Sequence, residues 1–264
     1  MAQERFVDDE WARRGASFGA VADAYAEHRP DYPQAAVRWC LAPAGPDAAA
    51  LRVLDLGAGT GKLTAVLAGL GAEVTAVEPD ASMLAALRRG LPSVRALPGA
   101  AEAIPLAGQS VDAVLSGQAL HWFDMSRAMP EIARVLVPGG VLAGLWNCDD
   151  DRVPWVAGLQ EAAGGVASLS LFRQRAAAAR YGMNQFGPEL FTPAERAEFG
   201  HGQPRSAESL VATIATHSKL LVMPVAERGQ VLDRVRGYLA ARPETSDGEF
   251  TLPMVTAAVR SVRR

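Results

Sequence analysis

Cysteine and lysine are both scarce in this sequence of 264 residues, and each shortage excludes a class of chemistry. The two cysteines, Cys40 and Cys148, are too few for a disulfide framework and fit a reducing compartment. Neither has another cysteine or a histidine at metal-ligand spacing, so we expect no metal site. The only lysines are Lys62 and Lys219, which leaves little scope for Schiff-base chemistry.

Long hydrophobic runs and an excess of basic residues are also missing. No apolar stretch approaches the roughly 20 residues that span a bilayer, and the polar N-terminus has no apolar signal core. A net charge of −3 gives no reason to expect nucleic acid or an anionic membrane as a partner. We therefore expect a cytoplasmic protein that acts on a small molecule, and nothing in the sequence indicates its oligomeric state.

The first half of the chain alternates short apolar runs with helical patterns. Such alternation predicts βαβ units, in which a parallel sheet carries helices on both faces. We expect an α/β fold with a doubly wound, mostly parallel sheet of seven strands. The expected strands are 51–56, 73–78, 93–97, 111–115 and 141–146. The expected helices are 18–28, 33–41, 61–69, 80–89 and 126–137, the last closed by the turn Pro138-Gly139-Gly140.

The pattern changes after Asn147. Residues 150–190 read as helices and loops with scattered aromatics, and we interpret them as a cap. Residues 196–203 fit a strand, although Thr192 and Glu195 also fit the capping box of a helix. Helices are expected at 206–215 and 224–241, and an edge strand at 250–262. The simplest organisation is a single domain (1–264) with an N-terminal helical lead (1–50), a cofactor-binding core (51–147), the cap (150–190) and a segment that completes the sheet (191–264).

The stretch from Val53 to Lys62, VLDLGAGTGK, predicts a ligand site at the end of a strand. Its glycines allow a tight turn and a close approach of backbone to ligand, and the helix that follows presents free N–H groups. A phosphate-binding loop would need glycine where Leu56 stands, six residues before the lysine, and Ser or Thr where Leu63 stands. The dinucleotide fingerprint G-x-G-x-x-G is incomplete, because Lys62 or Thr64 replaces its third glycine.

An acid precedes the glycines, which gives the pattern D-x-G-x-G-x-G. A second acid, Glu78, lies 21 residues beyond Gly57 (78 − 57 = 21), where an acid can bind ribose hydroxyls. The blocks DLGAGTGK, VEPDASML, GAAEAIP, VDAVLSGQALHWF and RVLVPGG occur in this order. Together they resemble the class I S-adenosylmethionine-dependent methyltransferases of the type 11 (menaquinone and ubiquinone biosynthesis-like) group, over about residues 53–146. The segment YAEHRPDYP resembles the lead of trans-aconitate methyltransferase-like enzymes.

The resemblance implies S-adenosylmethionine as the cofactor. Asp55 would orient its amino group and Glu78 would bind its ribose, while Met83 and Glu102 would meet its adenine. The predicted cofactor-binding residues are Tyr25, Arg29, Asp55, Gly57, Ala58, Gly59, Gly61, Glu78, Pro79, Met83, Ala101, Glu102, Ser116 and Gln118.

His121 is the candidate catalytic base, because it lies just past the fourth expected strand, where substrate meets cofactor in this fold. An imidazole there could accept a proton near neutral pH, although packing or a structural hydrogen bond would explain it equally well. The predicted substrate-lining residues are Tyr32, Trp122, Trp146 and Tyr181, with aromatic core packing as the alternative.

We therefore predict an enzyme that transfers a methyl group from S-adenosylmethionine to a small-molecule acceptor, in a setting such as secondary metabolism. Methylation of oxygen, nitrogen or carbon is open. One alternative is an NAD-dependent dehydrogenase, and another is a cofactor-bound protein of the same fold that methylates nothing. The strand end Ser116-Gly117-Gln118 lacks the Asn/Asp-Pro-Pro-aromatic block of nucleic-acid amino methyltransferases.

Overall fold

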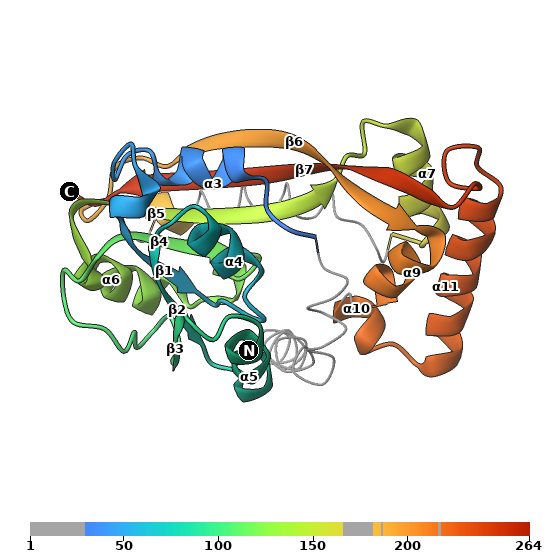
Figure 1. The fold of residues 1–264 in the computed structure, drawn as a ribbon. Coiled ribbons are helices and arrows are strands. Elements are labelled where there is room, and N and C mark those ends of the chain that lie inside the picture. The colour runs from blue at the N-terminus through green and yellow to red at the C-terminus, as the bar shows by residue number, and fades with distance from the viewer. Residues whose placement is uncertain (1–29, 166–181, 186, 216–217) are drawn as a thin grey trace. The chain divides into compact units, whose positions relative to one another are not determined.

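The structure, a computed structural model, describes residues 30–165, 182–185, 187–215 and 218–264. Contacts divide these residues into two compact units, whose elements are drawn in Figure 1. The first, which we call the sheet unit, contains residues 30–148, 182–185, 187–201 and 255–264. The second, the helical unit, contains residues 149–165, 202–215 and 218–254. The predicted helix 18–28 lies outside the described residues.

One seven-stranded sheet has the order β3-β2-β1-β4-β5-β7-β6. Its strands are β1 (Arg52–Leu56), β2 (Glu73–Glu78), β3 (Arg95–Pro98), β4 (Val111–Gly117), β5 (Leu136–Asp149), β6 (Glu195–Ser206) and β7 (Glu249–Val262). The pairs β1-β2, β2-β3, β1-β4 and β4-β5 run parallel. This confirms the predicted α/β fold. The strand order reverses between β1 and β4, and ligands of such sheets bind at the carboxyl ends of the strands beside that point.

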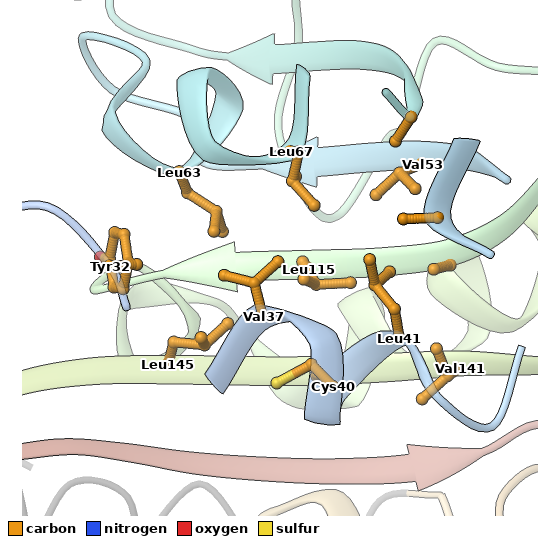
Figure 2. Packing of buried hydrophobic residues seen from close by; sticks show 14 of the residues in the cluster. Tyr32, Val37, Cys40, Leu41, Val53, Leu63, Leu67, Leu115, Val141 and Leu145 are labelled. Carbon is orange, nitrogen blue, oxygen red and sulfur yellow. The ribbon is translucent and has the colours of Figure 1, made fainter. Parts of the chain in front are cut away.

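The helices that accompany the first five strands lie close to their predicted positions. They are α3 (Gln34–Leu41), α4 (Lys62–Gly69), α5 (Ala81–Gly90) and α6 (Met125–Val135), with short 3-10 turns η2 (Ala48–Ala50) and η3 (Leu120–Trp122). Figure 2 shows Val37, Cys40 and Leu41 of α3 packed among side chains of β1, β4, β5 and α4. The end of the predicted lead is therefore part of the core of the sheet unit. Burial raises the pKa of the Cys40 thiol, which suits a structural residue.

The junction between α6 and β5 differs from the prediction of a helix to residue 137 and a strand from residue 141. In the structure α6 ends at Val135 and β5 begins at Leu136. The pairing of β4 with β5 shifts register at this point, and such an irregularity accommodates Pro138 within a strand. The N–H of Gly139 also donates to the carbonyl of Arg263 at 3.0 Å, so the segment after β7 is hydrogen-bonded to this part of β5.

The prediction that residues 250–262 form an edge strand is wrong. β7 lies between β5 and β6, and β6 is the edge. Every residue from Val255 to Val259 is buried, as expected for a strand covered on both faces. β6 instead alternates exposed and half-buried residues over most of its length, which is typical of an edge. The strand interpretation of residues 196–203 is confirmed, and the helix alternative is wrong.

The helical unit contains α7 (Pro154–Ala162), α9 (Ala207–Ala215), α10 (Ser218–Leu221) and α11 (Val225–Ala240). α7, from the predicted cap, shares one hydrophobic core with α9 and α11. Trp155 packs edge-on against Phe250, with ring centroids 5.8 Å apart, and its carbonyl accepts a hydrogen bond from Tyr238 Oη at 2.8 Å. Helices on both sides of the predicted boundary at residue 190 thus pack together, while the division into domains stays a prediction.

The structure bears on two expectations, that the chain does not span a membrane and that its cysteines form no disulfide framework. Within the ranges that the structure describes, no helix is long and apolar enough to cross a membrane. Cys40 and Cys148 are both buried, and they form no disulfide. The cytoplasmic location stays a prediction.

Gly158→Ala is expected to destabilise the helical unit, although alanine favours helix. A Cβ at Gly158 would lie 2.4 Å from Tyr238 Oη, so the tyrosine must move and lose its bond to Trp155. The clash should cost about 1–3 kcal/mol, against ~1 kcal/mol gained in helix propensity. Thermal unfolding measures the difference. Gly237→Ala in α11 is the matched control, because no atom of the described residues lies within 4 Å of its added Cβ. Equal unfolding temperatures for the two variants would contradict this account.

Candidate active site

The glycine loop joins β1 to α4. Its three glycines have positive φ, with values of 71° at Gly57, 57° at Gly59 and 93° at Gly61. The N–H groups of Gly57 and Ala58 both donate to the carbonyl of Val77 in β2, at 2.9 and 3.1 Å. A Cβ at Gly57 would lie 2.6 Å from the Cβ of Ala119, in the segment after β4. Position 57 therefore requires glycine both for its φ and for this close approach.

Asp55 is fully buried in β1, beside the glycine loop. Its Oδ2 accepts a hydrogen bond from Thr64 Oγ at 2.6 Å, which ties α4 to β1. Its Oδ1 is buried and has no hydrogen-bond partner among the residues that the structure describes. Burial, opposed by the hydrogen bonds from Thr64 and reinforced by the charge of Glu78, raises the pKa of Asp55 to about 7. Asp55 thus offers a buried acceptor to a ligand, and a cationic ligand would relieve the repulsion between the two carboxylates.

Glu78 ends β2 and is only 6% exposed. Its Oε2 accepts from the N–H of Gly59 at 2.8 Å, and its Oε1 accepts from the N–H of Asp80 at 2.9 Å. Burial raises the pKa of Glu78, and the bonds from Asp80 and Gly59 oppose the shift. Each carboxylate oxygen keeps a second lone pair, so Glu78 can hold the loop and still accept from hydroxyl groups of a ligand.

Four further predicted cofactor residues lie after β2 and β3. Met83 is buried in α5. A Cβ added at Gly59, the second glycine of the loop, would lie 3.8 Å from the sulfur of Met83. Pro79 is exposed, and Ala101 is buried. Glu102 Oε1 accepts from the N–H of Asp124 at 2.8 Å, which links this segment to the start of α6. Met83 is therefore placed to meet a ligand on the loop, while a role of Glu102 toward adenine stays a prediction.

In the described part of the chain, buried oxygen atoms without hydrogen-bond partners occur at the carboxyl ends of the neighbouring strands β1 and β4. They are Asp55 Oδ1, Thr60 Oγ, Ser116 Oγ and Gln118 Oε1. Gln118 also has a φ of 59°, a costly conformation for a residue with a side chain and one that is frequent at functional sites. Because buried polar atoms nearly always have partners, these atoms are available to water or to a polar ligand, with the carboxylate and amide oxygens as acceptors and the hydroxyls as donors or acceptors.

His121 lies in η3, directly after β4. The Nε1 of Trp146, a fully buried residue of β5, donates to His121 Nδ1 at 3.1 Å. The ring of Trp122 is centred 5.0 Å from the imidazole. A Cβ at Gly57 would meet the ring of Phe123 at 3.4 Å, so the η3 segment packs against the glycine loop. The predicted base therefore stands beside the predicted cofactor loop, with one ring nitrogen already hydrogen-bonded.

The predicted substrate-lining aromatics occupy different environments. Tyr32 is 7% exposed and belongs to the core of the sheet unit, at the edge of the cluster in Figure 2. A Cβ at Gly117 would lie 2.5 Å from its Oη. These contacts, and the full burial of Trp146, favour the core-packing alternative for both residues. Trp122 is half-buried, and its substrate role stays a prediction. Tyr25, Arg29 and Tyr181 lie outside the described residues.

Asn147 is a site residue that the sequence did not single out, although a polar residue ending the run VLAGLWN was an available signal. Its Nδ2 donates to the carbonyls of Pro30 and Asp31, at 3.3 and 3.1 Å. Its Oδ1 accepts from Thr256 Oγ at 2.6 Å, and its carbonyl accepts from Gln118 Nε2 at 3.1 Å. Asn147 thus joins β7, the strained Gln118 and the segment before α3.

α4 carries two polar contacts that the sequence did not predict. Thr64 bonds Asp55, as described above, and Lys62 Nζ lies 3.0 Å from the carboxylate of Asp31. The pair of Lys62 with Asp31 is partly exposed and adds little stability, but it fixes the segment before α3 against the start of α4.

Asn147→Asp is expected to destabilise the sheet unit more than Asn147→Ala. The aspartate keeps the bond from Thr256 but sets a carboxylate oxygen against the carbonyl oxygens of Pro30 and Asp31. The excess cost should be about 1–3 kcal/mol at pH 8, and it should shrink toward pH 5 as the new carboxyl regains a hydrogen to donate. Urea unfolding at both pH values measures it. An aspartate variant as stable as the alanine variant at pH 8 would argue against this network.

Known proteins resemble the chain along most of its length. A family described as Methyltransferase domain matches residues 54–144. An uncharacterized methyltransferase of Mycobacterium tuberculosis (strain H37Rv) is 43% identical over 246 residues, which cover 93% of this chain and 95% of the relative. An uncharacterized methyltransferase of Schizosaccharomyces pombe is 34% identical over 251 residues, 92% of this chain and 95% of the relative. A solved structure from Anaeromyxobacter dehalogenans, provisionally described as a type II methyltransferase, has the same fold, with a TM-score of 0.63 at 24% identity over 89% of this chain and 97% of that chain.

Proposed function

Because this chain belongs to the class I S-adenosylmethionine-dependent methyltransferases, in the type 11 group, we propose that it methylates a small-molecule acceptor. The cofactor, S-adenosylmethionine, supplies a methyl group that is already activated on a sulfonium. The protein's own task is to bind and align the two reactants, and alignment alone can lower a barrier by ~7–11 kcal/mol.

The observation that carries this proposal is the group of unpartnered oxygen atoms at the ends of β1 and β4. The amino group of the cofactor has the hydrogen-bond donors that Asp55 Oδ1 and Gln118 Oε1 lack. Its positive charge suits Asp55, whose own charge is disfavoured by burial and by Glu78. Glu78 can accept the ribose hydroxyls with the lone pairs that it does not use on the loop. These residues fit the cofactor, and Met83 would pack on the adenine.

A small acceptor is supported by the composition of the chain and by the strand end after β4. The net charge is −3, and the sequence Ser116-Gly117-Gln118 differs from the block of nucleic-acid amino methyltransferases. The dehydrogenase alternative has no support from the family. Thr64 also stands where the dinucleotide fingerprint would place its third glycine, and its hydroxyl is engaged with Asp55.

Calorimetry and label transfer test the proposal. We expect S-adenosylhomocysteine to bind, NAD not to bind, and label from S-adenosylmethionine to pass to at least one member of a panel of carboxylic acids, phenols and amines. Binding without transfer to any member would favour a protein that holds the cofactor but methylates nothing. Neither binding nor transfer would refute the proposal.

Glu78→Gln is expected to weaken the binding of S-adenosylhomocysteine about 10- to 100-fold. The amide replaces one acceptor oxygen with an NH2 group, which would face the N–H of Gly59 or of Asp80 and could accept nothing from the ribose. Calorimetry measures the affinity. Glu73→Gln, an exposed position at the other end of β2, is the control and should bind like the wild type. Unchanged affinity in the Glu78 variant would remove its ribose role.

A further inference from the structure

The side chain of Gln118 continues the hydrogen bonding between β4 and β5 after the backbone has turned away. The N–H of Gln118 donates to the carbonyl of Leu145 at 2.8 Å. The backbone then leaves the strand at Gln118 with a φ of 59°. The next carbonyl of β5 that faces β4 is that of Asn147, and it accepts from Gln118 Nε2 at 3.1 Å. The side-chain amide thus takes the place of a backbone N–H in the ladder.

This bond fixes which way the amide of Gln118 faces. A carbonyl oxygen can only accept, so the NH2 group lies toward Asn147 and Oε1 faces away from β5. Oε1 is buried and has no hydrogen-bond partner among the described residues. The strand on the other side of β4 is β1, which carries Asp55 and leads into the glycine loop. Gln118 is therefore prepared to accept from a ligand at that loop.

The side chain of Asn147 is itself held in one orientation. Asn147 is 2% exposed, and its Nδ2 donates to the carbonyls of Pro30 and Asp31. Because these carbonyls only accept, Oδ1 must lie on the opposite side, where it accepts from Thr256 Oγ at 2.6 Å. The only hydrogen of that hydroxyl is then used, so Thr256 Oγ accepts from His201 Nε2 at 3.1 Å.

The backbone that Asn147 holds lies against the same strand ends. The carboxylate of Asp31 lies 3.0 Å from Lys62 Nζ, at the start of α4. A Cβ at Gly117, the residue before Gln118, would lie 2.5 Å from Tyr32 Oη. Residues 30–32 therefore contact the end of β4, the end of β5 and the first turn after the glycine loop.

We propose that Asn147 is a positioning residue for the amino-acid end of the cofactor. Its carbonyl holds the amide of Gln118 with Oε1 as the acceptor, and its side chain holds residues 30–32 against the same strand ends. The inference rests on the proposed function. The amino group is the part of the cofactor that can donate to Oε1, whereas the adenosine would meet Glu78 and Met83. Asn147 should therefore affect one end of the ligand and not the other.

Two ligands separate the ends of the cofactor site. S-adenosylhomocysteine has the amino-acid end, and methylthioadenosine has the same adenosine and sulfur without it. Asn147→Ala keeps the carbonyl but removes the three bonds that hold its side chain. It should weaken S-adenosylhomocysteine about 5- to 20-fold and leave methylthioadenosine within about 2-fold of the wild type. Equal losses for both ligands, which a general loosening of the sheet unit would cause, or no loss for either, would overturn the inference.

Thr256 tests the same link from a residue in β7. Thr256→Val removes the hydroxyl that holds Asn147 and should weaken S-adenosylhomocysteine about 3- to 10-fold, whereas Thr256→Ser keeps the hydroxyl and should bind like the wild type. Added to Asn147→Ala, the valine should cause no further loss of affinity. Thr245→Val is the matched control, because its buried hydroxyl donates to the carbonyl of Leu239 within the helical unit. A similar loss of affinity in the control, or an additive loss in the double variant, would contradict the link.

Two substitutions at Gln118 test which end of its amide meets the ligand. Gln118→Met should weaken S-adenosylhomocysteine about 10- to 100-fold, and Gln118→Glu should lose less, because a carboxylate still accepts from an amino group. If the NH2 group of Gln118 instead met the ligand's carboxylate, the glutamate would repel that carboxylate. Weaker binding by Gln118→Glu than by Gln118→Met would therefore overturn the inference.

These measurements also separate the inference from the proposed function. If the wild type binds S-adenosylhomocysteine and transfers label, but the variants at positions 118, 147 and 256 bind like it, the inference is wrong and the proposed function stands. If the wild type does not bind S-adenosylhomocysteine, the proposed function is wrong. Ligand-free protein then still tests the orientation of the amide. At pH 8 Gln118→Glu should unfold at a lower urea concentration than Gln118→Met, because its carboxylate would face the carbonyl of Asn147. Equal midpoints would show that this bond does not hold the side chain.

Discussion

Asp55→Asn is expected to lower the affinity for S-adenosylhomocysteine about 100-fold or more, and at neutral pH to stabilise the ligand-free protein. Asparagine keeps the shape of the side chain and can still accept from Thr64 Oγ. Its NH2 group, however, replaces Oδ1, the oxygen that has no partner within the described ranges. The variant therefore cannot accept the amino group of the cofactor and carries no charge to match it.

The opposite effect on stability follows from the pKa of Asp55. Burial raises this pKa to about 7 in the folded protein, whereas an aspartate in an unfolded chain has a pKa of about 4. Between these values the folded state holds a proton that the unfolded state has released. The free energy of unfolding must therefore fall as the pH rises from about 4 to about 7. Each of the roughly three pH units between these pKa values corresponds to about 1.4 kcal/mol. Asparagine never ionises, so the variant should lack this decline and be more stable than the wild type by about 4 kcal/mol at pH 8.

Urea unfolding of the ligand-free proteins at pH 5, 6, 7 and 8 measures this difference. Thr64→Val is the matched control. It leaves the carboxyl group in place but removes a hydrogen bond that favours the charged form. Its stability should decline with pH at least as steeply as that of the wild type, and it should still bind S-adenosylhomocysteine. If Asp55→Asn retains the wild-type dependence on pH, Asp55 is not the group that titrates.

Asp55 also illustrates what the sequence could predict. Its position before the glycines and the spacing to Glu78 are local features, and they predicted both the site and the strands around it. β2 occupies the predicted residues 73–78, and β1 begins one residue later than predicted. The contact of Asp55 with Thr64 spans only nine residues of sequence and lies within the predicted strand and helix. Where a strand, a turn and a helix follow each other directly in the sequence, the local residue pattern is enough to predict most of their structure.

Long-range pairing limited the prediction elsewhere. The weak alternation of residues 250–262 suggested an edge strand, because nothing local reports that β6 pairs on its outer side. The run Val255–Val259 was the one available sign of burial on both faces. Asn147 bonds Asp31 and Thr256, which are 116 and 109 residues away. His121 shows the same limit at shorter range, since the hydrogen bond to its Nδ1 comes from a tryptophan 25 residues further along.

Gly57→Ala is expected to be the most destabilising alanine substitution in the glycine loop. Its φ of 71° costs a residue with a side chain about 1–2 kcal/mol. The new Cβ would also lie 2.6 Å from the Cβ of Ala119 and 3.4 Å from the ring of Phe123. Neither Cβ can rotate away, because each is attached directly to backbone. The loop or the η3 turn must shift, at a further cost of about 1–3 kcal/mol, and turnover should fall because His121 moves with the turn.

Gly59→Ala separates strain from contact. Position 59 also has a positive φ, of 57°, but its nearest neighbour would be the sulfur of Met83 at an ordinary 3.8 Å. It should lose only the strain term, about 1–2 kcal/mol. Ala119→Gly removes the contact itself. In the double variant Gly57→Ala with Ala119→Gly, we therefore expect a smaller loss in the free energy of unfolding than in Gly57→Ala alone. After the effect of Ala119→Gly alone is subtracted, this loss should be within about 1 kcal/mol of the loss in Gly59→Ala.

Urea unfolding without ligand measures this double-mutant cycle. The result also shows whether the protein's own packing or the ligand requires glycine at position 57. A coupling between positions 57 and 119 means that the protein's own segment after β4 occupies the space of a Cβ at position 57. The loop and the His121 turn would then be one packed unit before any cofactor binds. An absent coupling, with normal stability and lost binding of S-adenosylhomocysteine, would mean that only the ligand requires the space. The 2.6 Å between a Cβ at position 57 and the Cβ of Ala119 predicts that the two positions are coupled. In that case a substitution in the cofactor loop also changes the turn that contains His121, on the side of the methyl acceptor.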